Sequence, residues 1–467
     1  MYIDSHAHLF KAEYGDELPD VIKRAEDSGV ECIVVPATNV ATSREAIELA
    51  ERHPSVYACV GIHPHEAANA AQGDITIVQE LLQHPKVVAL GEIGLDFYYD
   101  FAPRATQIDL FREQVNLAVE KNIPIVVHTR DSIGETIAVV EEIITRAGNW
   151  RTIPSDNGQT IRYPRGVFHC FSGDESDAWR VINLGFLVSY PGIVTFKKSP
   201  ALATLERIGY DHLLLETDSP YMTPVPYRGK RNEPAHIGLI ARKIAEIVDA
   251  TPEDVARATR FNTKRLFGIG GAHEPQIAYQ LRNSLYLNIT IRCNADCVFC
   301  DRKGAAIVKG YSLRITEEPE VDEIIRSIGD PLKYDEIVFC GYGEPTIRLD
   351  DLKKVARWVK TEGGKVRLNT DGHGSIINKR NIVPELVGLV DVVSISYNTS
   401  DPEQYGRLMR IEGERFHKAM VEFTLECKRL LPRVVMTIVE LPEVDIERAR
   451  REIEETLGCE FKLRPYF

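Results

Sequence analysis

Histidines and carboxylates of the kind that bind divalent metal ions recur through the first half of the chain. The six candidate ligands are His6, His8, Glu92, His128, His169 and Asp218. Because residues two apart on a strand share one face, the two histidines of Asp-Ser-His-Ala-His can reach the same ion. Four imidazoles and two carboxylates suffice for two ions, with Glu92 as the natural bridge. Two such ions activate water and neutralise a phosphate in hydrolysis.

A lone histidine at a strand end is more often a structural residue than a ligand, but six suitable residues on five strand ends favour a site. Mixed imidazole and carboxylate ligands accept Mg²⁺, Mn²⁺ or Zn²⁺. His63 and His65, in Gly-Ile-His-Pro-His, can bind substrate phosphate, although His65 equally fits a surface loop. Arg130 and Arg228 are further candidate phosphate contacts.

Three cysteines in the second half form C-x3-C-x2-C directly after an apolar run. Cys293, Cys297 and Cys300 can bind three irons of a cubane cluster and leave the fourth iron open to a small molecule. A zinc site is the alternative. The chain has nine cysteines, and an odd count argues against a disulfide framework.

Glycines and polar side chains follow the next strands of the second half. In Cys-Gly-Tyr-Gly-Glu-Pro, Gly341 and Gly343 allow the backbone to approach a ligand, and Glu344 can accept hydrogen bonds from an ammonium group. Asn369 and Ser396 offer polar ligands at the ends of the two following strands.

Apolar runs alternate with amphipathic stretches in the first part, which predicts a (β/α)8 barrel. The eight expected strands are residues 2–8, 32–38, 56–64, 88–96, 124–130, 165–171, 186–192 and 213–218. The six candidate ligands fall in the C-terminal halves of these strands, the end at which barrel active sites lie. A polar insertion at 146–163 is expected to border that mouth.

The βα pattern restarts after the glycines of residues 268–271, and it predicts a partial (β/α)6 barrel. The six expected strands are residues 285–291, 336–340, 365–369, 391–397, 433–439 and 460–466. The predicted organisation is a first domain at 1–268, a linker at 269–281 and a second domain at 282–467. The fold class is therefore α/β throughout.

Charge and hydropathy exclude several classes of protein. The net charge of −13 over 467 residues lacks the basic excess of a non-specific duplex binder. No apolar run approaches the ~18 residues that a membrane span needs. Residues 1–10 lack the layout of a signal peptide, so a cytoplasmic protein is expected.

The first part resembles the TatD family of metal-dependent hydrolases over residues 1–268. The motifs are Asp-Ser-His-Ala-His, Gly-Ile-His-Pro-His, Gly-Glu-Ile-Gly-Leu-Asp, Val-His-Thr-Arg-Asp, His-Cys-Phe-Ser-Gly and Glu-Thr-Asp-Ser-Pro-Tyr. The resemblance implies an amidohydrolase-type TIM barrel and a deoxyribonuclease or phosphodiesterase that acts on 3′ ends or single strands. It implies one ion on His6, His8, Glu92 and Asp218, and another on Glu92, His128 and His169. Asp218 would also be the base for the attacking water.

The second part resembles the radical S-adenosylmethionine superfamily over residues 281–467. The resemblance implies a [4Fe-4S] cluster on the three cysteines and S-adenosylmethionine at the open iron. Phe299 would lie near the adenine and residues 341–345 near the methionine amine, although Tyr342 departs from the usual glycine motif. An electron donor such as flavodoxin or ferredoxin would drive formation of a 5′-deoxyadenosyl radical, which abstracts hydrogen from an unknown substrate.

Together the two parts predict a bifunctional fusion of a TatD-type nuclease with a radical domain. One alternative is that the barrel cleaves an amide or ester, such as an aminoacyl linkage. The other is that the second domain is a binding or redox-sensing module.

Overall fold

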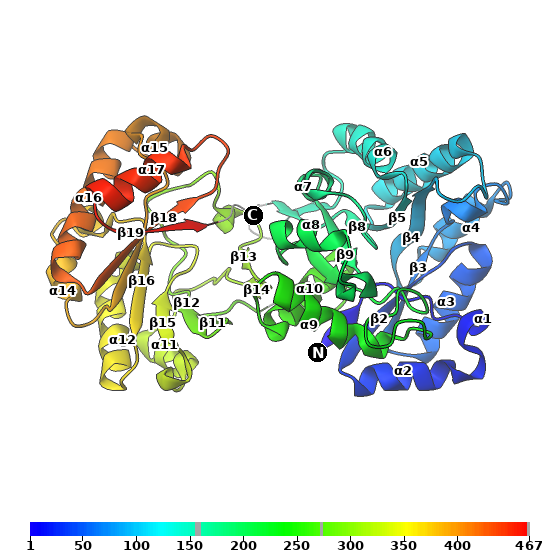
Figure 1. Ribbon diagram of the computed structural model, residues 1–467, viewed down its shortest axis with the longest axis horizontal. Helices are drawn as coiled ribbons and strands as arrows, with labels where there is room; N and C mark the ends of the chain where they lie inside the picture. The colour runs from blue at the N-terminus through cyan, green and yellow to red at the C-terminus, as the bar shows by residue number, and fades with distance from the viewer. Residues whose placement is uncertain (155–159, 271–273, 465–467) are drawn as a thin grey trace. The chain divides into compact units, whose positions relative to one another are not determined.

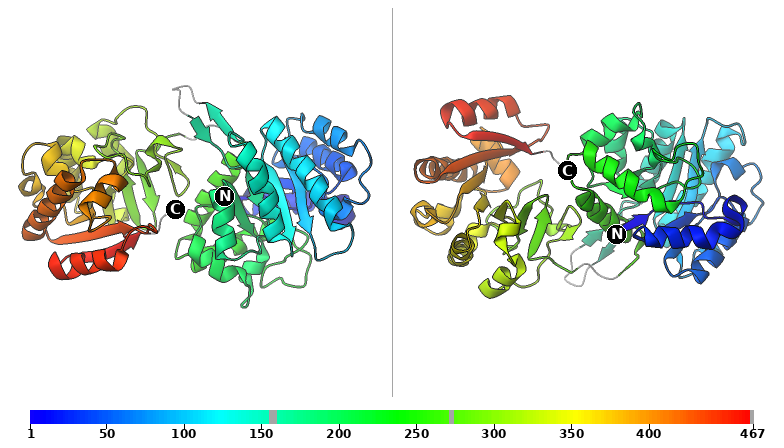
Figure 2. Two further views of the ribbon diagram at one scale, coloured as in Figure 1. Left: turned by 90° about the horizontal axis from the view of Figure 1, so that it is seen from above. Right: turned by 60° about the horizontal axis from the view of Figure 1, so that its bottom comes forward.

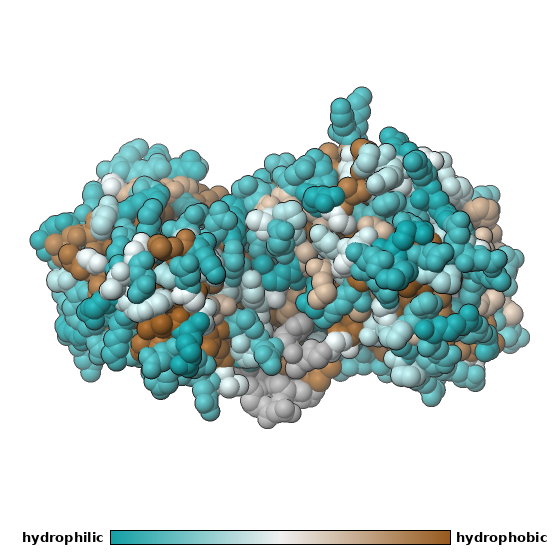
Figure 3. All heavy atoms as spheres, turned by 90° about the horizontal axis from the view of Figure 1, so that it is seen from below, coloured by the Kyte–Doolittle hydropathy of each residue, from teal (hydrophilic) through white to brown (hydrophobic). Residues whose placement is uncertain are grey.

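Two units divide the chain in the computed structural model, Met1–Ala272 and His273–Phe467. The structure describes residues 1–154, 160–270 and 274–464 (Figure 1). Residues 271–273 of the predicted linker and 465–466 of the last expected strand therefore lie outside the described residues. Hydrophilic side chains cover most of the face drawn in Figure 3, with apolar residues in smaller separate areas.

The first unit is a parallel barrel with strand order β1-β2-β3-β4-β5-β8-β9-β10. Its strands are β1 (Tyr2–Asp4), β2 (Val30–Pro36), β3 (Val56–Val60), β4 (Val87–Asp96), β5 (Ile125–Arg130), β8 (Gly166–Phe168), β9 (Phe186–Tyr190) and β10 (Leu213–Leu215). A parallel bridge between Ala7 and Ser219 joins the continuations of the first and last strands. Each strand overlaps an expected one, and the prediction of a (β/α)8 barrel is confirmed.

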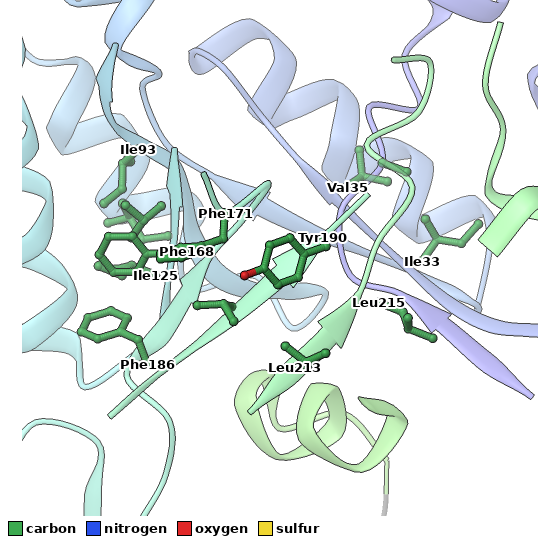
Figure 4. Packing of buried hydrophobic residues seen from close by; sticks show 14 of the residues in the cluster. Ile33, Val35, Ile93, Ile125, Phe168, Phe171, Phe186, Tyr190, Leu213 and Leu215 are labelled. Carbon is green, nitrogen blue, oxygen red and sulfur yellow. The ribbon is translucent and has the colours of Figure 1, made fainter. Parts of the chain in front are cut away.

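Helices surround this barrel (Figure 1). They are α1 (Lys11–Tyr14), α2 (Leu18–Asp27), α3 (Val40–Arg52), α4 (Asp74–Leu81), α5 (Arg104–Lys121), α6 (Ile133–Arg146), α7 (Glu175–Asn183), α8 (Ala201–Ile208), α9 (Ile237–Ile247) and α10 (Pro252–Phe267). Buried residues such as Ile33, Val35, Leu213 and Leu215 form the apolar layer of the main core (Figure 4).

A separate cluster of buried side chains takes one residue from each barrel strand. Its strand members are Ile3, Val34, Cys59, Ala89, Val126, Val167, Leu187 and Leu214. Since side chains alternate along a strand, these residues point away from the main core and fill the barrel interior. Leu266, Phe267 and Ile269, at and just after the end of α10, complete the cluster.

The insertion before the sixth barrel strand forms a hairpin, β6 (Thr152–Pro154) and β7 (Thr160–Arg162); its residues 155–159 lie outside the described residues. The hairpin lies between α6 and β8, where the chain approaches the N-terminal end of a strand. Arg151 donates from Nη2 to the carbonyl of Leu266 in α10 at 2.7 Å. The prediction that this insertion borders the mouth is therefore wrong, because the mouth is at the opposite ends of the strands.

The second unit has a seven-stranded sheet with the order β11-β12-β15-β16-β17-β18-β19. Its strands are β11 (Ala278–Leu281), β12 (Ser284–Leu287), β15 (Glu336–Phe339), β16 (Val366–Thr370), β17 (Val392–Ser396), β18 (Arg433–Val439) and β19 (Glu460–Arg464). Six strands are parallel, which confirms the predicted partial barrel, and β11 adds an antiparallel edge within the stretch expected to be linker. Figure 2 shows the ribbon of this unit from two further directions.

Helices and a small hairpin complete this unit. They are β13 (Ile307–Val308), β14 (Tyr311–Ser312), α11 (Val321–Ile328), α12 (Leu349–Thr361), α13 (Gly374–Ile377), α14 (Val383–Leu386), α15 (Pro402–Met409), α16 (Gly413–Leu430) and α17 (Ile446–Arg451). The sequence had not indicated α15, which begins with an Asp401 cap and Pro402. None of the described helices has the length and apolar character needed to cross a membrane.

Candidate functional site

Backbone pairing between the first and last strands brings the first ligand group together. The amide of His8 donates to the carbonyl of Ser219 at 2.7 Å, and the amide of Asp218 donates to the carbonyl of His6 at 2.9 Å. The side chains of His6, His8 and Asp218 therefore lie at one point of the mouth. His6 Nε2 lies 3.2 Å from His8 Nε2 and 3.9 Å from Asp218 Oδ1.

Glu92, on β4, presents one carboxylate oxygen to this group. Its Oε2 lies 3.4 Å from His6 Nε2 and 3.5 Å from His8 Nε2. The side chains of Glu92 and His6 are almost completely buried.

The other oxygen of Glu92 faces a second group of histidines. Its Oε1 lies 2.8 Å from His128 Nδ1, 2.8 Å from His169 Nε2 and 3.4 Å from His63 Nε2. The structure thus brings together all six predicted ligands and adds His63, which the sequence had assigned to substrate binding. The two oxygens of one carboxylate point to separate imidazole groups, which is the arrangement expected of a bridging ligand.

The electrostatics of the cluster suit cations. Burial lowers the pKa of His6 and His8, and it lowers that of His63 to about 4, so these rings are neutral and present lone pairs. Although burial opposes ionisation, the surrounding histidines, His169 foremost, hold the pKa of Glu92 well below its usual value. Although burial opposes it, the charge of Glu92 raises the pKa of His169 to about 9, so a cation that binds on that side would displace a proton from the ring. Imidazoles around a buried carboxylate are the donor set that divalent metals take, and the residues present fit two ions.

Asp218 carries a different protonation preference. Burial and the negative charges of Glu216 and Glu92 raise the pKa of its carboxyl to about 8 when no cation is bound. A cation bound beside Asp218 would favour its ionised form.

Asp96 is a residue of this site that the sequence analysis did not single out. Its Oδ2 lies 3.0 Å from His128 Nε2 and 2.8 Å from His65 Nε2. Hydrogen bonds from His128, Tyr99 and His65 lower the pKa of Asp96 despite its burial. A signal was available, because Asp96 follows Glu92 by four residues and so shares its face of β4.

Glu216 is the second missed residue, and it lies behind His169. Its Oε1 accepts from the amide of Cys170 at 2.7 Å, and its Oε2 accepts from Ser189 Oγ at 2.7 Å. The same Oε2 lies 3.8 Å from His169 Nδ1.

The predicted substrate contacts lie around the cluster. His65 joins the group with Asp96 and His128. Arg130 lies over the ring of Tyr98, with its guanidinium carbon 4.0 Å from the centroid, and Arg228 lies over Phe196 at 4.3 Å.

In the second unit, the end of α15 holds the cysteine loop. The amide of Asp296 donates to the carbonyl of Met409 at 3.0 Å, and the amide of Val298 donates to that of Leu408 at 2.8 Å. The Cys297 thiol donates to Met409 Sδ at 3.3 Å.

Burial raises the pKa of all three thiols, that of Cys293 to about 12. The negative charge of Asp371 contributes to the shift at Cys293 and Cys297. Thiolates in this place therefore need a positive partner, and iron supplies one.

A buried pair of carboxyl groups lies beside these cysteines. Glu344 Oε1 accepts from the amide and hydroxyl of Thr346 and from the hydroxyl of Thr370, and its Oε2 accepts from the amide of Asp371. Burial and the charge of Asp371 raise the pKa of Glu344 to about 8. Asp371 Oδ2 is buried and lies 3.2 Å from His373 Nδ1. The pair fits a positively charged ligand such as an amine.

Buried amide oxygens point to a polar ligand in the same unit. Those with no hydrogen-bond partner among residues 274–464 are the Oδ1 atoms of Asn288, Asn294, Asn369 and Asn398. Such atoms cost free energy unless a donor reaches them. They suit a cofactor rich in N–H and O–H groups.

The glycines of Cys-Gly-Tyr-Gly-Glu-Pro act in packing. A Cβ on Gly341 would lie 2.3 Å from Asn288 Oδ1, and one on Gly343 would lie 2.3 Å from the carbonyl oxygen of Thr290. The glycine loop therefore packs against the segment that leads to Cys293, and the amide of Glu344 donates to the carbonyl of Arg292 at 2.9 Å.

The last two predicted cofactor residues lie in the same unit. Phe299 packs against its core, and Ser396 ends β17, half-buried.

Two family models match the chain: TatD related DNase over residues 3–268, and the Radical SAM superfamily over residues 287–455. The first match spans more than half of the chain. The chain belongs to the TatD related DNase family. Its second unit carries a radical SAM domain, so both resemblances seen in the sequence are confirmed.

Relatives of this TatD-family chain match its first unit. The Bacillus subtilis protein named "Uncharacterized metal-dependent hydrolase YabD" is 38% identical over 271 residues, 58% of this chain and 100% of that protein. The Shigella flexneri protein named "3'-5' ssDNA/RNA exonuclease TatD" is 30% identical over 57% of this chain and 98% of its own length. The crystal structure of the Escherichia coli TatD homologue YJJV superposes with a TM-score of 0.51 at 28% identity, over 58% of this chain and 98% of that one. The protein is a TatD-family metal-dependent hydrolase fused to a radical SAM domain.

Proposed function

We propose that the first unit hydrolyses phosphodiester bonds of DNA, at single-stranded regions or 3′ ends, with two divalent cations. The proposal depends on one observation: the two carboxylate oxygens of Glu92 face two separate groups of imidazoles. The Shigella relative named for exonuclease activity supports the choice of substrate.

Residues of this chain would share the work as follows. One ion would be held by His6, His8, Glu92 and Asp218, and the other by Glu92, His128 and His169, with His63 beside them. When bound, the ions neutralise phosphate charge and lower the pKa of water. Asp218 accepts the proton of the attacking water, and Arg130 and Arg228 offset the charge of the strand.

The test is cleavage of a 5′-labelled single-stranded oligonucleotide with Mn²⁺ or Mg²⁺. Wild type and the exposed-surface control Glu113→Ala should shorten the strand, whereas Glu92→Ala should lose at least about a hundredfold in rate, because both groups lose a shared ligand. Hydrolysis of an aminoacyl ester with no cleavage of any oligonucleotide would replace the phosphodiester by an acyl substrate.

For the second unit, we propose a [4Fe-4S] cluster on Cys293, Cys297 and Cys300, with S-adenosylmethionine at the open iron. The buried acid pair Glu344 and Asp371 would bind the methionine amine, and Phe299 would lie near the adenine. Asn369 and Ser396 would add polar contacts. A reductant such as flavodoxin or ferredoxin would supply the electron, and the radical formed would act on a further substrate.

Anaerobic reconstitution with iron and sulfide, followed by S-adenosylmethionine and dithionite, tests this part. Release of 5′-deoxyadenosine that depends on all three cysteines is expected. A protein that binds S-adenosylmethionine but releases none would point to the binding or redox-sensing alternative.

A further inference from the structure

Large hydrophobic side chains gather on the surface of the first unit in two loops, one after β4 and one after β10. They are Tyr98, Tyr99, Phe101, Tyr221, Met222, Val225 and Tyr227. Both loops lie at the C-terminal ends of strands, the end that carries the metal ligands. Single exposed hydrophobic residues are ordinary, but a cluster next to a candidate site indicates a binding surface.

The loop after β4 carries three aromatic rings in mutual contact, which we call the aromatic platform: Tyr98, Tyr99 and Phe101. Their exposed fractions are 58%, 39% and 59%. The Tyr99 and Phe101 rings stack, with centroids 5.3 Å apart and planes at 29°, and Tyr98 meets Tyr99 edge-on at 4.8 Å. Rings that contact one another while remaining exposed form a preorganised apolar surface.

The platform is attached directly to the candidate metal centre. His65 lies 4.8 Å from Phe101 and 5.4 Å from Tyr99, measured between ring centroids. Asp96 makes the second connection, because its Oδ1 accepts from the amides of Tyr98 and Tyr99 at 3.0 and 3.1 Å. Its other oxygen contacts His65 and His128.

Gln107, on α5, fixes the loop from the other side. Its Oε1 accepts from the amide of Asp96 at 2.9 Å, and its Nε2 donates to the carbonyls of Asp96 and Ala102 at 3.0 and 2.9 Å. The buried amide therefore holds both ends of the aromatic segment. These hydrogen bonds fix the position of the aromatic platform relative to the candidate metal ligands.

A positive charge accompanies the rings. The guanidinium carbon of Arg130 lies 4.0 Å from the centroid of Tyr98 and 4.7 Å from that of Tyr99. No carboxylate within the described ranges forms an ion pair with it. A cation resting on aromatic faces, beside a site for phosphate, is the combination used to bind single strands.

We propose that the aromatic platform is a subsite for an unpaired nucleobase of the strand whose phosphodiester lies at the metal centre. The inference rests on the proposed phosphodiesterase function. It adds to that function a surface that selects single-stranded over double-stranded nucleic acid. A base inside a duplex has both faces covered by its neighbours, so the platform accepts only bases of single strands or frayed ends. Stacking is tolerant of sequence, because every base has a π-face. It also gives an acidic protein an attraction to DNA that does not depend on a basic surface.

The test compares two strands of equal length on the full chain, oligothymidylate and a strand of abasic tetrahydrofuran residues. Dissociation constants are measured by fluorescence anisotropy with Mn²⁺ on strands that carry phosphorothioate linkages, which resist hydrolysis and leave Glu92 in place. Tyr99→Ala combined with Phe101→Ala should weaken binding of oligothymidylate about tenfold and leave the abasic strand unchanged. Tyr99→Phe should keep the affinity, because stacking needs the ring and not the hydroxyl.

Leu425→Ala is the matched control, since Leu425 is 48% exposed on α16 of the other unit. Unchanged thermal midpoints exclude a folding defect. Equal binding of both strands by the parent protein, or equal weakening of both by the alanine pair, would overturn the subsite. Cleavage of oligothymidylate by the wild type is scored separately. If the wild type does not cleave oligothymidylate but still binds it more tightly than the abasic strand, the proposed phosphodiesterase function is wrong and the base subsite is supported.

Discussion

Oδ2 of Asp96 lies 3.0 Å from Nε2 of His128. The other ring nitrogen of His128 lies 2.8 Å from Glu92. A carboxylate in this position fixes the Nε2–H tautomer and leaves the Nδ1 lone pair for a cation. Asp96 thus orients a candidate ligand without being a predicted ligand itself.

Asp96→Asn should weaken binding of Mn²⁺ about 10- to 100-fold, because His128 and His65 lose the charge that orients them. Isothermal titration of the metal-free protein measures the affinity. Asp109→Asn, at an exposed position of α5, is the control and should bind like wild type. Equal affinities for the two variants would remove Asp96 from the site.

Metal removal should lower the stability of the first unit. Cations that bind only the folded barrel stabilise it by about 2.7 kcal/mol at a hundred times their dissociation constant. The thermal midpoint should therefore fall with a chelator and rise with added Mn²⁺. Glu92→Ala should abolish that rise, while Glu113→Ala should keep it. A metal-dependent midpoint in Glu92→Ala would argue against a shared ligand.

Cys297→Ala should remove the visible absorbance of the reconstituted cluster and spare hydrolysis by the barrel. The physical reason is that a cubane on three thiolates cannot be held by two. Cys32→Ala, in the first unit, should retain about four irons per chain, as a cubane requires. If Cys297→Ala also stopped hydrolysis, the two activities would be coupled.

Gly343→Ala should destabilise the second unit by about 1–3 kcal/mol, the usual cost of forced overpacking. Its Cβ would lie 2.3 Å from the carbonyl oxygen of Thr290 and 2.7 Å from that of Arg292, and both are backbone atoms. Gly134→Ala is the control, since nothing lies within 4 Å of a Cβ there. Chemical denaturation compares the two. Equal stability of Gly343→Ala and wild type would show that the loop can move.

The sequence was sufficient for the barrels because strands of parallel sheets are continuous apolar runs bounded by loops. The sequence was insufficient for β11, a strand of four residues in an expected linker. It was also insufficient for the insertion at 146–163, because the end of the barrel at which an insertion lies depends on which elements it connects. The candidate ligands at strand ends, which the structure brings together, were predictable from their chemistry. Asp96 was not singled out, although its spacing of four residues from Glu92 places both on one face of β4. Glu216 was missed because a carboxylate behind a candidate ligand has no motif of its own. Tyr98 and Phe101 gave no signal, since only the structure separates exposed aromatic residues from core ones.

The small cluster that includes Leu266, Phe267 and Ile269 sets where the hydrolase ends. The chain leaves the barrel just after the side chains that close its interior, on a segment that carries none of the candidate ligands. A relative such as the Bacillus protein, which matches over its whole length, ends with the barrel itself. A second domain can therefore follow the barrel at this point without any change to the loops that carry the candidate ligands.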